Sequence, residues 1–179
     1  MENAALALQA FVLLGLPWQA PVLAAALQQA RVAGRLDRRR LSWQGRTLNL
    51  LLDVGHNPHA AQYLARRLAE RPPRGRRLAV FGLLGDKDLP GVIEPLLGVV
   101  AQWAVAPLPT PRSRSAEQLQ AALQACGASA SAWPSVAAAL DAQAGQAAEE
   151  DEILVFGSFY SVAEALHWLE QHDQSARGS

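Results

Sequence analysis

The sequence is poor in the residues that disulfide scaffolds and metal clusters require. Its 179 residues include one cysteine, Cys126, which excludes an intrachain disulfide and a multi-cysteine metal site. This usage fits a reducing cytoplasm, and near the end of an expected helix Cys126 is typical of a buried small hydrophobic residue. With 16 basic and 16 acidic residues the formal net charge is +0. No electrostatic footprint for nucleic acid or an anionic membrane follows from that balance.

Long apolar runs and several catalytic motifs are also missing. No run reaches the ~18 apolar residues that a membrane span needs, and the Ala/Leu-rich N-terminal stretch lacks the basic leader of a signal peptide. There is no Gly-x-x-x-x-Gly-Lys-Ser/Thr loop, no Gly-x-Gly-x-x-Gly after a strand, no Gly-x-Ser-x-Gly and no His-Glu-x-x-His. Four histidines and one cysteine give no useful metal-ligand spacing.

The composition does support a packed core, because 50% of the residues are hydrophobic and 18% are charged. From residue 46 onward, apolar strands alternate with segments of helical periodicity. Strands are expected at 47–53, 77–83, 102–106, 129–133 and 152–156, and helices at 58–70, 89–99, 115–125, 135–147 and 158–171. This alternation predicts an α/β, Rossmann-like fold with a mainly parallel sheet and helices on both faces.

The residues before this region follow a different pattern. A helical stripe ends at Gly15, and Pro21 begins a second helix with an apolar face. Two short helices cannot bury that much apolar surface by themselves. Residues 34–46 are predicted to be a polar, arginine-rich link with solvated side chains, and residues 173–179 a flexible tail.

Residues 48–61 carry the most informative pattern, in which a strand, an acid, a glycine turn and a helix start follow one another. Residues 48–52 are too apolar for an exposed edge and are typical of a buried parallel strand. Asp53 then lies at the carboxyl end of the strand, where open α/β sheets bind their ligands. Asn57 can cap the next helix, and Pro58 suits its first turn. We expect Asp53 to present two free acceptor oxygens at a crevice, which suits the vicinal hydroxyls of a ribose.

Several blocks of the sequence, taken in order, resemble the C-terminal domain of the folylpolyglutamate synthase/dihydrofolate synthase family, which is related to the Mur ligases. Residues 53–61 are similar to that family's Asp-x-Ala-His-Asn-Pro-His-Ala-Ala segment. Gly34-Arg35-Leu36 resembles its Pro-Gly-Arg-Phe segment, although Ala33 and Leu36 depart from the usual Pro and Phe. Further similar blocks lie at residues 81–88, 106–113 and 156–163, so the similarity covers nearly the whole chain.

The resemblance implies an ATP-dependent ligase of folate biosynthesis. In that family ATP phosphorylates a carboxylate of dihydropteroate or folate, and the amine of L-glutamate attacks the acyl phosphate. The family's P-loop and Mg²⁺ ligands lie in its N-terminal domain, which is implied as a partner. Residues 1–33 would then be the tail of that ATP-binding domain, residues 34–46 an interdomain link and residues 47–172 the glutamate-ligase domain.

The resemblance also implies roles for five residues around ATP. Arg35 would reach the phosphates and take part in catalysis, because a guanidinium spreads positive charge over planar donors. Asp53 would bind the ribose, and Asn3, His56 and Asn57 would also contact the nucleotide. Arg35 could instead be solvated, and Asp53 could be a turn residue. Asn3 and Asn57 could be helix caps, and His56 could orient its loop through a backbone carbonyl.

Three further residues are candidate contacts to the incoming glutamate. Lys87 stands in an Asp-Lys-Asp turn after a strand, where related ligases use a lysine for the amino acid's carboxylate. Ser158 and Tyr160 open the last helix, and free amides at a helix start suit a carboxylate. A surface ion pair is the alternative for Lys87, and a helix cap is the alternative for Ser158.

Three functions stay open at this point. The first is the C-terminal part of a bifunctional dihydrofolate/folylpolyglutamate synthase, whose isolated C-terminal part is expected to be inactive. The second is another Mur-type ligase with a different amino acid and acceptor. The third is a stand-alone nucleotide-binding module or an inactive remnant, because the P-loop is absent. The Gly-Ser-Phe-Tyr turn at 157–160, together with the His-Asn-Pro-His segment at 56–59, favours the folate branch.

Overall fold

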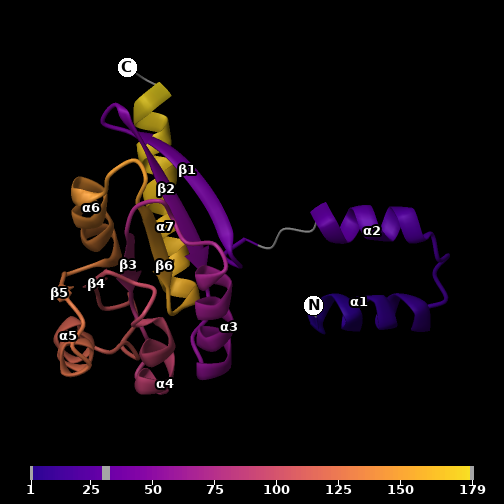
Figure 1. Ribbon diagram of the computed structural model, residues 1–179, viewed down its shortest axis with the longest axis horizontal. Helices are drawn as coiled ribbons and strands as arrows, with labels where there is room; N and C mark the ends of the chain where they lie inside the picture. Colours follow the sequence, from indigo (N-terminus) through magenta and orange to yellow (C-terminus); the bar gives the residue numbers. More distant parts are fainter. Residues whose placement is uncertain (1, 30–32, 178–179) are drawn as a thin grey trace. The chain divides into compact units, whose positions relative to one another are not determined.

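The computed structural model describes residues 2–29 and 33–177, and it describes the side chains of residues 5–27 and 33–173 (Figure 1). The chain divides into two compact units, one up to residue 32 and one from Ala33 onward. Along the chain, two helices form the first unit, and the second unit begins with two consecutive strands, after which helices and strands alternate.

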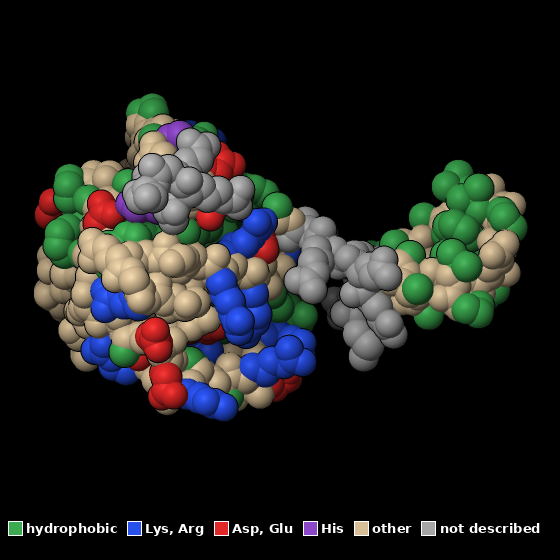
Figure 2. Space-filling view, turned by 90° about the horizontal axis from the view of Figure 1, so that it is seen from above, with side chains coloured by type: hydrophobic (Ala, Val, Ile, Leu, Met, Phe, Trp, Pro, Cys, Tyr) green, Lys and Arg blue, Asp and Glu red, His purple; other side chains and the backbone are tan. Residues whose placement is uncertain are grey.

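The first unit consists of two helices, α1 (Glu2–Leu13) and α2 (Ala20–Gln29), as predicted. Residues 3–30 contain no charged residue. Figure 2 shows hydrophobic side chains over much of the surface of this unit, and Leu13 is 86% exposed. Within residues 2–29 and 33–177, none of the helices has the length and apolar character needed to cross a bilayer.

The second unit is built on a six-stranded sheet with the strand order β1-β2-β6-β3-β4-β5. β1 pairs antiparallel with β2, and the other neighbouring strands run parallel. The strands are β1 (Asp37–Trp43), β2 (Arg46–Asp53), β3 (Arg77–Phe81), β4 (Gln102–Val105), β5 (Ala130–Ala132) and β6 (Glu152–Phe156). The predicted α/β fold with a mainly parallel sheet is confirmed.

Helices cover both faces of this sheet (Figure 1). They are α3 (Pro58–Ala69), α4 (Leu89–Ile93), the 3₁₀ turn η1 (Glu94–Leu96), α5 (Ala116–Ala125), α6 (Val136–Gln146) and α7 (Phe159–Arg177). Alternate residues of each central strand contribute to two cores, since side chains point to opposite faces. One core includes α3, α4 and α5, and the other includes α6 and α7. Phe81 stacks on Phe156 at 4.7 Å between ring centroids in the first of these cores.

The predicted polar link at 34–46 was wrong for most of its length. Residues 37–43 form the edge strand β1, and the turn at Gln44-Gly45 closes a hairpin with β2. Both turn residues have positive φ, +49° and +79°, as a type I′ hairpin turn requires. The arginines of β1 lie on an edge strand, where charge discourages further strand pairing, while Leu41 is buried in the core.

Three smaller predictions also differ from the structure. The helix expected at 89–99 is broken into α4 and η1, because Pro95 has no backbone amide to continue the hydrogen bonds of α4, whereas Pro90 lies in the first turn, where proline is tolerated. The last helix begins one residue later than expected and continues to Arg177, so the residues expected to form a tail are largely helical. Cys126 is exposed at the C-cap of α5 instead of being buried.

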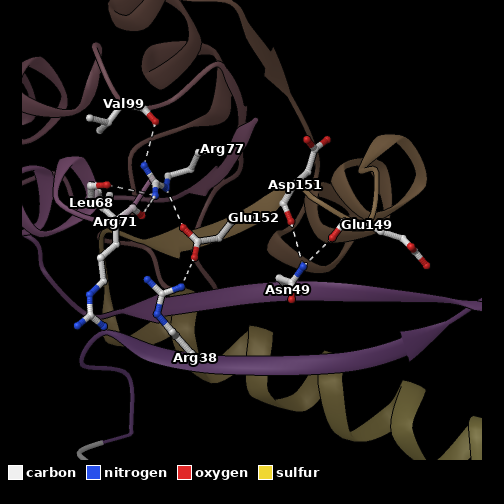
Figure 3. Close-up of polar contacts among 9 residues, drawn as sticks. All are labelled: Arg38, Asn49, Leu68, Arg71, Arg77, Val99, Glu149, Asp151 and Glu152. Carbon is white, nitrogen blue, oxygen red and sulfur yellow. Dashed lines mark hydrogen bonds and ion pairs between the residues drawn. The ribbon is translucent and has the colours of Figure 1, made fainter. Parts of the chain in front are cut away.

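The amino ends of the strands are tied together by a buried ion pair (Figure 3). Arg77 opens β3 and Glu152 opens β6, and they are 4% and 5% exposed. Nε of Arg77 donates to Oε1 of Glu152 at 2.8 Å, and Arg38 of β1 donates to the other carboxylate oxygen. The Arg77 guanidinium also donates to the carbonyls of Leu68, Arg71 and Val99. These bonds join β1, β3 and β6 to the end of α3 and to the segment before β4, at the end of the sheet opposite to the crevice.

Asp151 organises the turn next to this ion pair. Its carboxylate accepts hydrogen bonds from the backbone amides of Arg76 and Ala148, at 2.6 and 3.1 Å. It also forms an ion pair with the Arg76 guanidinium at 2.8 Å. Burial raises the pKa of Asp151, but these hydrogen bonds lower it more, so its pKa lies below the usual range. A lowered pKa means that the carboxylate stabilises the fold above its unfolded value of about 3.9 and stops doing so as the pH falls through the folded value.

We expect Asp151→Asn to reduce the free energy of unfolding of the 179-residue chain at pH 7 by about 1–3 kcal/mol. The NH₂ group of asparagine would replace one acceptor oxygen and would face a backbone N–H that also donates. The difference from the wild type should shrink as the pH is lowered below 4. Urea midpoints measured from pH 7 to pH 3 test this. Glu149→Gln, at an exposed side chain in the same loop, is the matched control. A difference that stays constant with pH would contradict the assignment.

Candidate functional site

The carboxyl ends of the central strands form the candidate site. β2 continues into α3 on one face of the sheet, whereas its parallel neighbour β6 continues into α7 on the other face. Loops that diverge in this way mark a topological switch point, which is where open α/β sheets bind ligands, and we call this region at the strand ends the crevice. Residues 53–57 and 157–160 border this crevice, and the rings of His56 and Phe159 lie 6.1 Å apart.

Asp53 is the last residue of β2 and is 7% exposed. Its Oδ1 accepts a hydrogen bond from the amide of Gly55 at 2.7 Å, and its Oδ2 accepts one from the amide of Leu36 at 3.0 Å. The expectation of two free acceptor oxygens was therefore wrong. A carboxylate oxygen carries two lone pairs, so each oxygen retains one for a ligand.

Arg35 lies in a tight turn beside Asp53. Gly34 and Leu36, on either side of it, have φ values of +70° and +46°. The Gly34 carbonyl accepts from the amide of Val54 at 2.8 Å, and its amide donates to Asp37. The Arg35 side chain is exposed, and among the described residues none forms a hydrogen bond or ion pair with it. The turn thus presents a free guanidinium on a fixed backbone.

His56 and Asn57 shape the loop between β2 and α3. Nδ1 of His56 lies 2.8 Å from the carbonyl of Val54, so in the neutral ring Nδ1 carries the proton and Nε2 is an acceptor. Oδ1 of Asn57 accepts from the amide of Ala60 at 2.9 Å and caps α3. Both local roles that the sequence offered as alternatives are therefore present, and they are compatible with ligand contacts.

The turn after β6 brings Ser158 and Tyr160 to the same end of the sheet. Gly157 has a φ of +104°, and a Cβ there would lie 2.4 Å from the carbonyl of Gly82, so only glycine fits. The buried Ser158 hydroxyl accepts from the amide of Tyr160 at 3.1 Å, which is a helix-start contact for α7. The exposed Tyr160 side chain lies at the first turn of that helix.

Lys87 lies in the loop between β3 and α4, where it pairs with a neighbouring acid. Its Nζ is 3.3 Å from Asp86, and Arg112 of the loop after β4 reaches the same carboxylate at 3.2 Å. The hydrogen bond from Lys87, together with the charges of Lys87 and Arg112, holds the pKa of the exposed Asp86 carboxyl below its usual range. The ion pair that was the alternative for Lys87 is present.

Sequence reasoning missed two arginines of this loop cluster as site residues. Arg112 shares Asp86 with Lys87, and Arg114 donates to the carbonyls of Gly85 and Lys87 at 3.0 and 2.9 Å. The sequence did contain a signal for them. Both arginines follow the strand expected at 102–106, just as Lys87 follows the strand expected at 77–83. Carboxyl ends of parallel strands meet at one edge, so such loops face one another.

The structure thus brings Arg35, Asp53, His56 and Asn57 together at the ends of β2 and β6, with Ser158 and Tyr160 across the crevice. Asn3 belongs to α1, and its side chain lies outside the described residues. A separate cleft of about 280 Å³ lies between the ends of β4 and β5 and involves none of the predicted residues. Among the described residues, no group of three or more His, Cys, Asp or Glu is placed to hold a metal ion.

Comparison with known proteins identifies relatives of this chain. A curated relative from Escherichia coli strain K12, dihydrofolate synthase/folylpolyglutamate synthase, is 45% identical over 121 residues, which is 68% of this chain and 28% of the relative. A relative with the same description from Haemophilus influenzae is 34% identical and covers 92% of this chain and 41% of its own length. The chain therefore spans between about a quarter and two fifths of these relatives.

A solved structure, E. coli FolC in complex with DHPP and ADP, superposes with a TM-score of 0.82 at 39% identity, over 99% of this chain and 39% of that one. Residues 34–159 match the family described as Mur ligase, glutamate ligase domain. These residues contain β1 to β6 and the whole candidate site except Asn3 and Tyr160. The chain therefore belongs to the Mur ligase family, through its glutamate ligase domain.

Proposed function

We propose that this chain is the C-terminal part of an ATP-dependent ligase that adds L-glutamate to dihydropteroate, to a reduced folate, or to both, through an acyl phosphate. The observation that carries the proposal is the 45% identity to the E. coli dihydrofolate synthase/folylpolyglutamate synthase, combined with the free Arg35 beside Asp53 at the crevice. One structure of a related bifunctional enzyme holds Mn, AMPPNP and L-glutamate, with a TM-score of 0.76 and 37% identity over 87% of this chain and 36% of that one.

In this proposal the chain provides the groups that close over the nucleotide. Asp53 contacts the ribose through its remaining lone pairs, and Arg35 reaches the phosphates. His56 and Asn57 lie beside the nucleotide, with Nε2 of His56 as an acceptor. Mg²⁺ would neutralise charge on the phosphates when bound, and we place its ligands in the part of the relatives that lies outside the stretch matched by this chain.

The amino acid would bind at the neighbouring loops. Lys87 offers an ammonium for the carboxylate of glutamate, after exchanging Asp86 for the ligand. Ser158 and Tyr160 stand at the start of α7, whose first amides favour a negative charge. Arg112 and Arg114 hold the Lys87 loop in place. The glutamate amine would then attack an acyl phosphate formed at the crevice.

The test uses a fusion in which this chain follows the ATP-binding region of the E. coli relative. We refer to this fusion as the full-length enzyme. ADP release is measured with dihydropteroate or tetrahydrofolate, with and without L-glutamate. We expect release that requires both substrates. Turnover only with another amino acid would favour a different Mur-type ligase. A folded enzyme that binds ATP but shows no turnover would indicate that the chain is an inactive nucleotide-binding remnant.

Within the full-length enzyme, Asp53→Ala is expected to raise the KM for ATP. Loss of a charged hydrogen bond costs about 1.5–3 kcal/mol, which corresponds to about a 10- to 150-fold increase. Steady-state rates over a range of ATP concentrations measure this. Glu149→Ala, an exposed acid at the opposite end of the sheet, controls for loss of charge. An unchanged dependence on ATP would remove Asp53 from the nucleotide site.

A further inference from the structure

Two segments far apart in the sequence are clasped together at the crevice. The amide of Leu36 donates to Asp53 at 3.0 Å, and the amide of Val54 donates to the carbonyl of Gly34 at 2.8 Å. The second carboxylate oxygen of Asp53 accepts from Gly55 at 2.7 Å. One carboxylate therefore fixes its own loop and the turn that carries Arg35.

The turn around Arg35 depends on this clasp, because its backbone is in an unfavourable region. Leu36 is not glycine and has a φ of +46°, a conformation that L side chains rarely adopt. A Cβ on Gly34 would lie 2.9 Å from Val162 and 3.0 Å from Val54, so the turn is pressed against α7 and the end of β2. Strained backbone persists only where its surroundings hold it, and the Asp53 carboxylate is one of the groups that hold Leu36.

The Arg35 side chain has no such support. It is exposed, and no described residue pairs with its guanidinium. The direction in which it leaves the protein is therefore set by the backbone of residues 34–36. Since the amide of Leu36 follows Arg35 directly, releasing that amide would free the peptide bond on which the orientation of Arg35 depends.

We propose that Asp53 is a positioning residue for Arg35, in addition to any contact that it makes with the nucleotide. This inference rests on the proposed function, because it assigns to Arg35 the catalytic role given above. A carboxylate that both accepts the ribose and fixes the arginine turn couples nucleotide binding to the placement of the positive charge. Loss of Asp53 would then lower kcat as well as raise the KM for ATP.

A double-mutant cycle in the full-length enzyme separates the two effects. We expect Asp53→Ala to lower kcat about tenfold or more when Arg35 is present and less than about twofold in an Arg35→Ala background. The increase in the KM for ATP should persist in both backgrounds. Equal losses of kcat in the two backgrounds would overturn the positioning role.

Gly34→Ala provides a second variant that leaves the carboxylate in place. The added Cβ and the positive φ should displace the turn. We expect kcat to fall while the KM for ATP changes by less than about threefold. Asp53→Asn, which keeps one acceptor oxygen, should fall between the wild type and Asp53→Ala. Wild-type kcat in Gly34→Ala would contradict the inference.

Amide hydrogen exchange in the 179-residue chain tests the clasp without any turnover. The Leu36 amide should be protected in the wild type and exchange at least about tenfold faster in Asp53→Ala, while amides in β3 and β6 stay protected and report that the sheet is folded. Unchanged protection of Leu36 would overturn the inference. An inactive wild-type enzyme would instead count against the proposed function, and the exchange result would still decide the clasp.

Discussion

Arg35→Ala is expected to lower kcat of the full-length enzyme by about 100- to 1,000-fold while the KM for ATP changes much less. This is the largest effect on activity that the structure predicts. In the proposed reaction, negative charge develops on the transferred phosphoryl group and on the leaving oxygens as the acyl phosphate forms. A guanidinium that meets this charge stabilises the transition state more than it stabilises bound ATP, so its removal mainly affects kcat.

The surroundings of Arg35 support a catalytic role over a solvated one. A solvated arginine needs no special backbone, yet this one stands between two residues with positive φ in a turn held by Asp53, Asp37 and Val54. Two neighbouring arginines of β1 form ion pairs instead. Arg38 pairs with Glu152, and Arg39 pairs with Asp37, which raises the pKa of Arg39 through the hydrogen bond and charge of that acid.

Single-turnover and steady-state kinetics would measure this effect. Arg40→Ala is the matched control, because Arg40 is an exposed arginine on the adjacent strand β1. Arg35→Lys should recover only part of the rate, since an ammonium cannot place two donors in the plane of a guanidinium. A loss confined to the KM for ATP would mean that Arg35 only helps to hold the substrate.

The part of the site that depends on local sequence could be predicted. The strand ending at Asp53, the Asn57 cap and the helix that follows lie in one continuous stretch, residues 46–69, and the local sequence signal of each is readable. The partners of Asp53 could not be predicted in the same way. The bond from Leu36 crosses 17 positions of sequence and exists only because the hairpin of β1 and β2 folds back. Tertiary hydrogen bonds of this kind leave no periodic signal.

The same distinction explains what was missed in the fold. The parallel strands were recognisable because both of their faces are buried, which makes them continuously apolar. β1 has one neighbour and a charged outer side, so its arginines concealed the alternation that ends in buried Leu41 and half-buried Trp43. The Gln44-Gly45 turn was the usable signal for that hairpin. The antiparallel edge strand could therefore be predicted only by combining the turn signal with the hydrophobic pattern.

The second large effect concerns stability, and it comes from the buried pair of Arg77 and Glu152 (Figure 3). Burying two charges is costly, so such a pair adds little net stability when both partners are present. Removing Arg77 leaves the buried Glu152 carboxylate with only the half-exposed Arg38 as its charged partner. Leaving one charge of a buried pair without its partner costs about 3–5 kcal/mol. Arg77→Ala also deprives the carbonyls of Leu68, Arg71 and Val99 of a donor. We therefore expect Arg77→Ala to lower the free energy of unfolding of the 179-residue chain by about this amount, because Arg38 still offsets part of the charge while the three carbonyls lose their donor.

Urea unfolding of the chain, followed by circular dichroism, would measure the loss. Arg67→Ala is the control, because Arg67 pairs with Glu70 on the exposed side of α3, where such pairs contribute about 0.3–0.5 kcal/mol. A loss for Arg77→Ala no larger than that of the control would show that the pair is not desolvated.

Replacing both partners distinguishes the energy of the pair from the cost of leaving one charge alone. In Arg77→Met with Glu152→Met, no charge stays buried at the start of β3 and β6, and the methionines retain much of the volume. This double variant should be more stable than Arg77→Ala by about 1–4 kcal/mol. Arg38 would lose its partner, but it is half exposed and returns to water. A double variant as unstable as Arg77→Ala would assign the main contribution to the carbonyl bonds of Arg77 instead, since those bonds are lost in both variants.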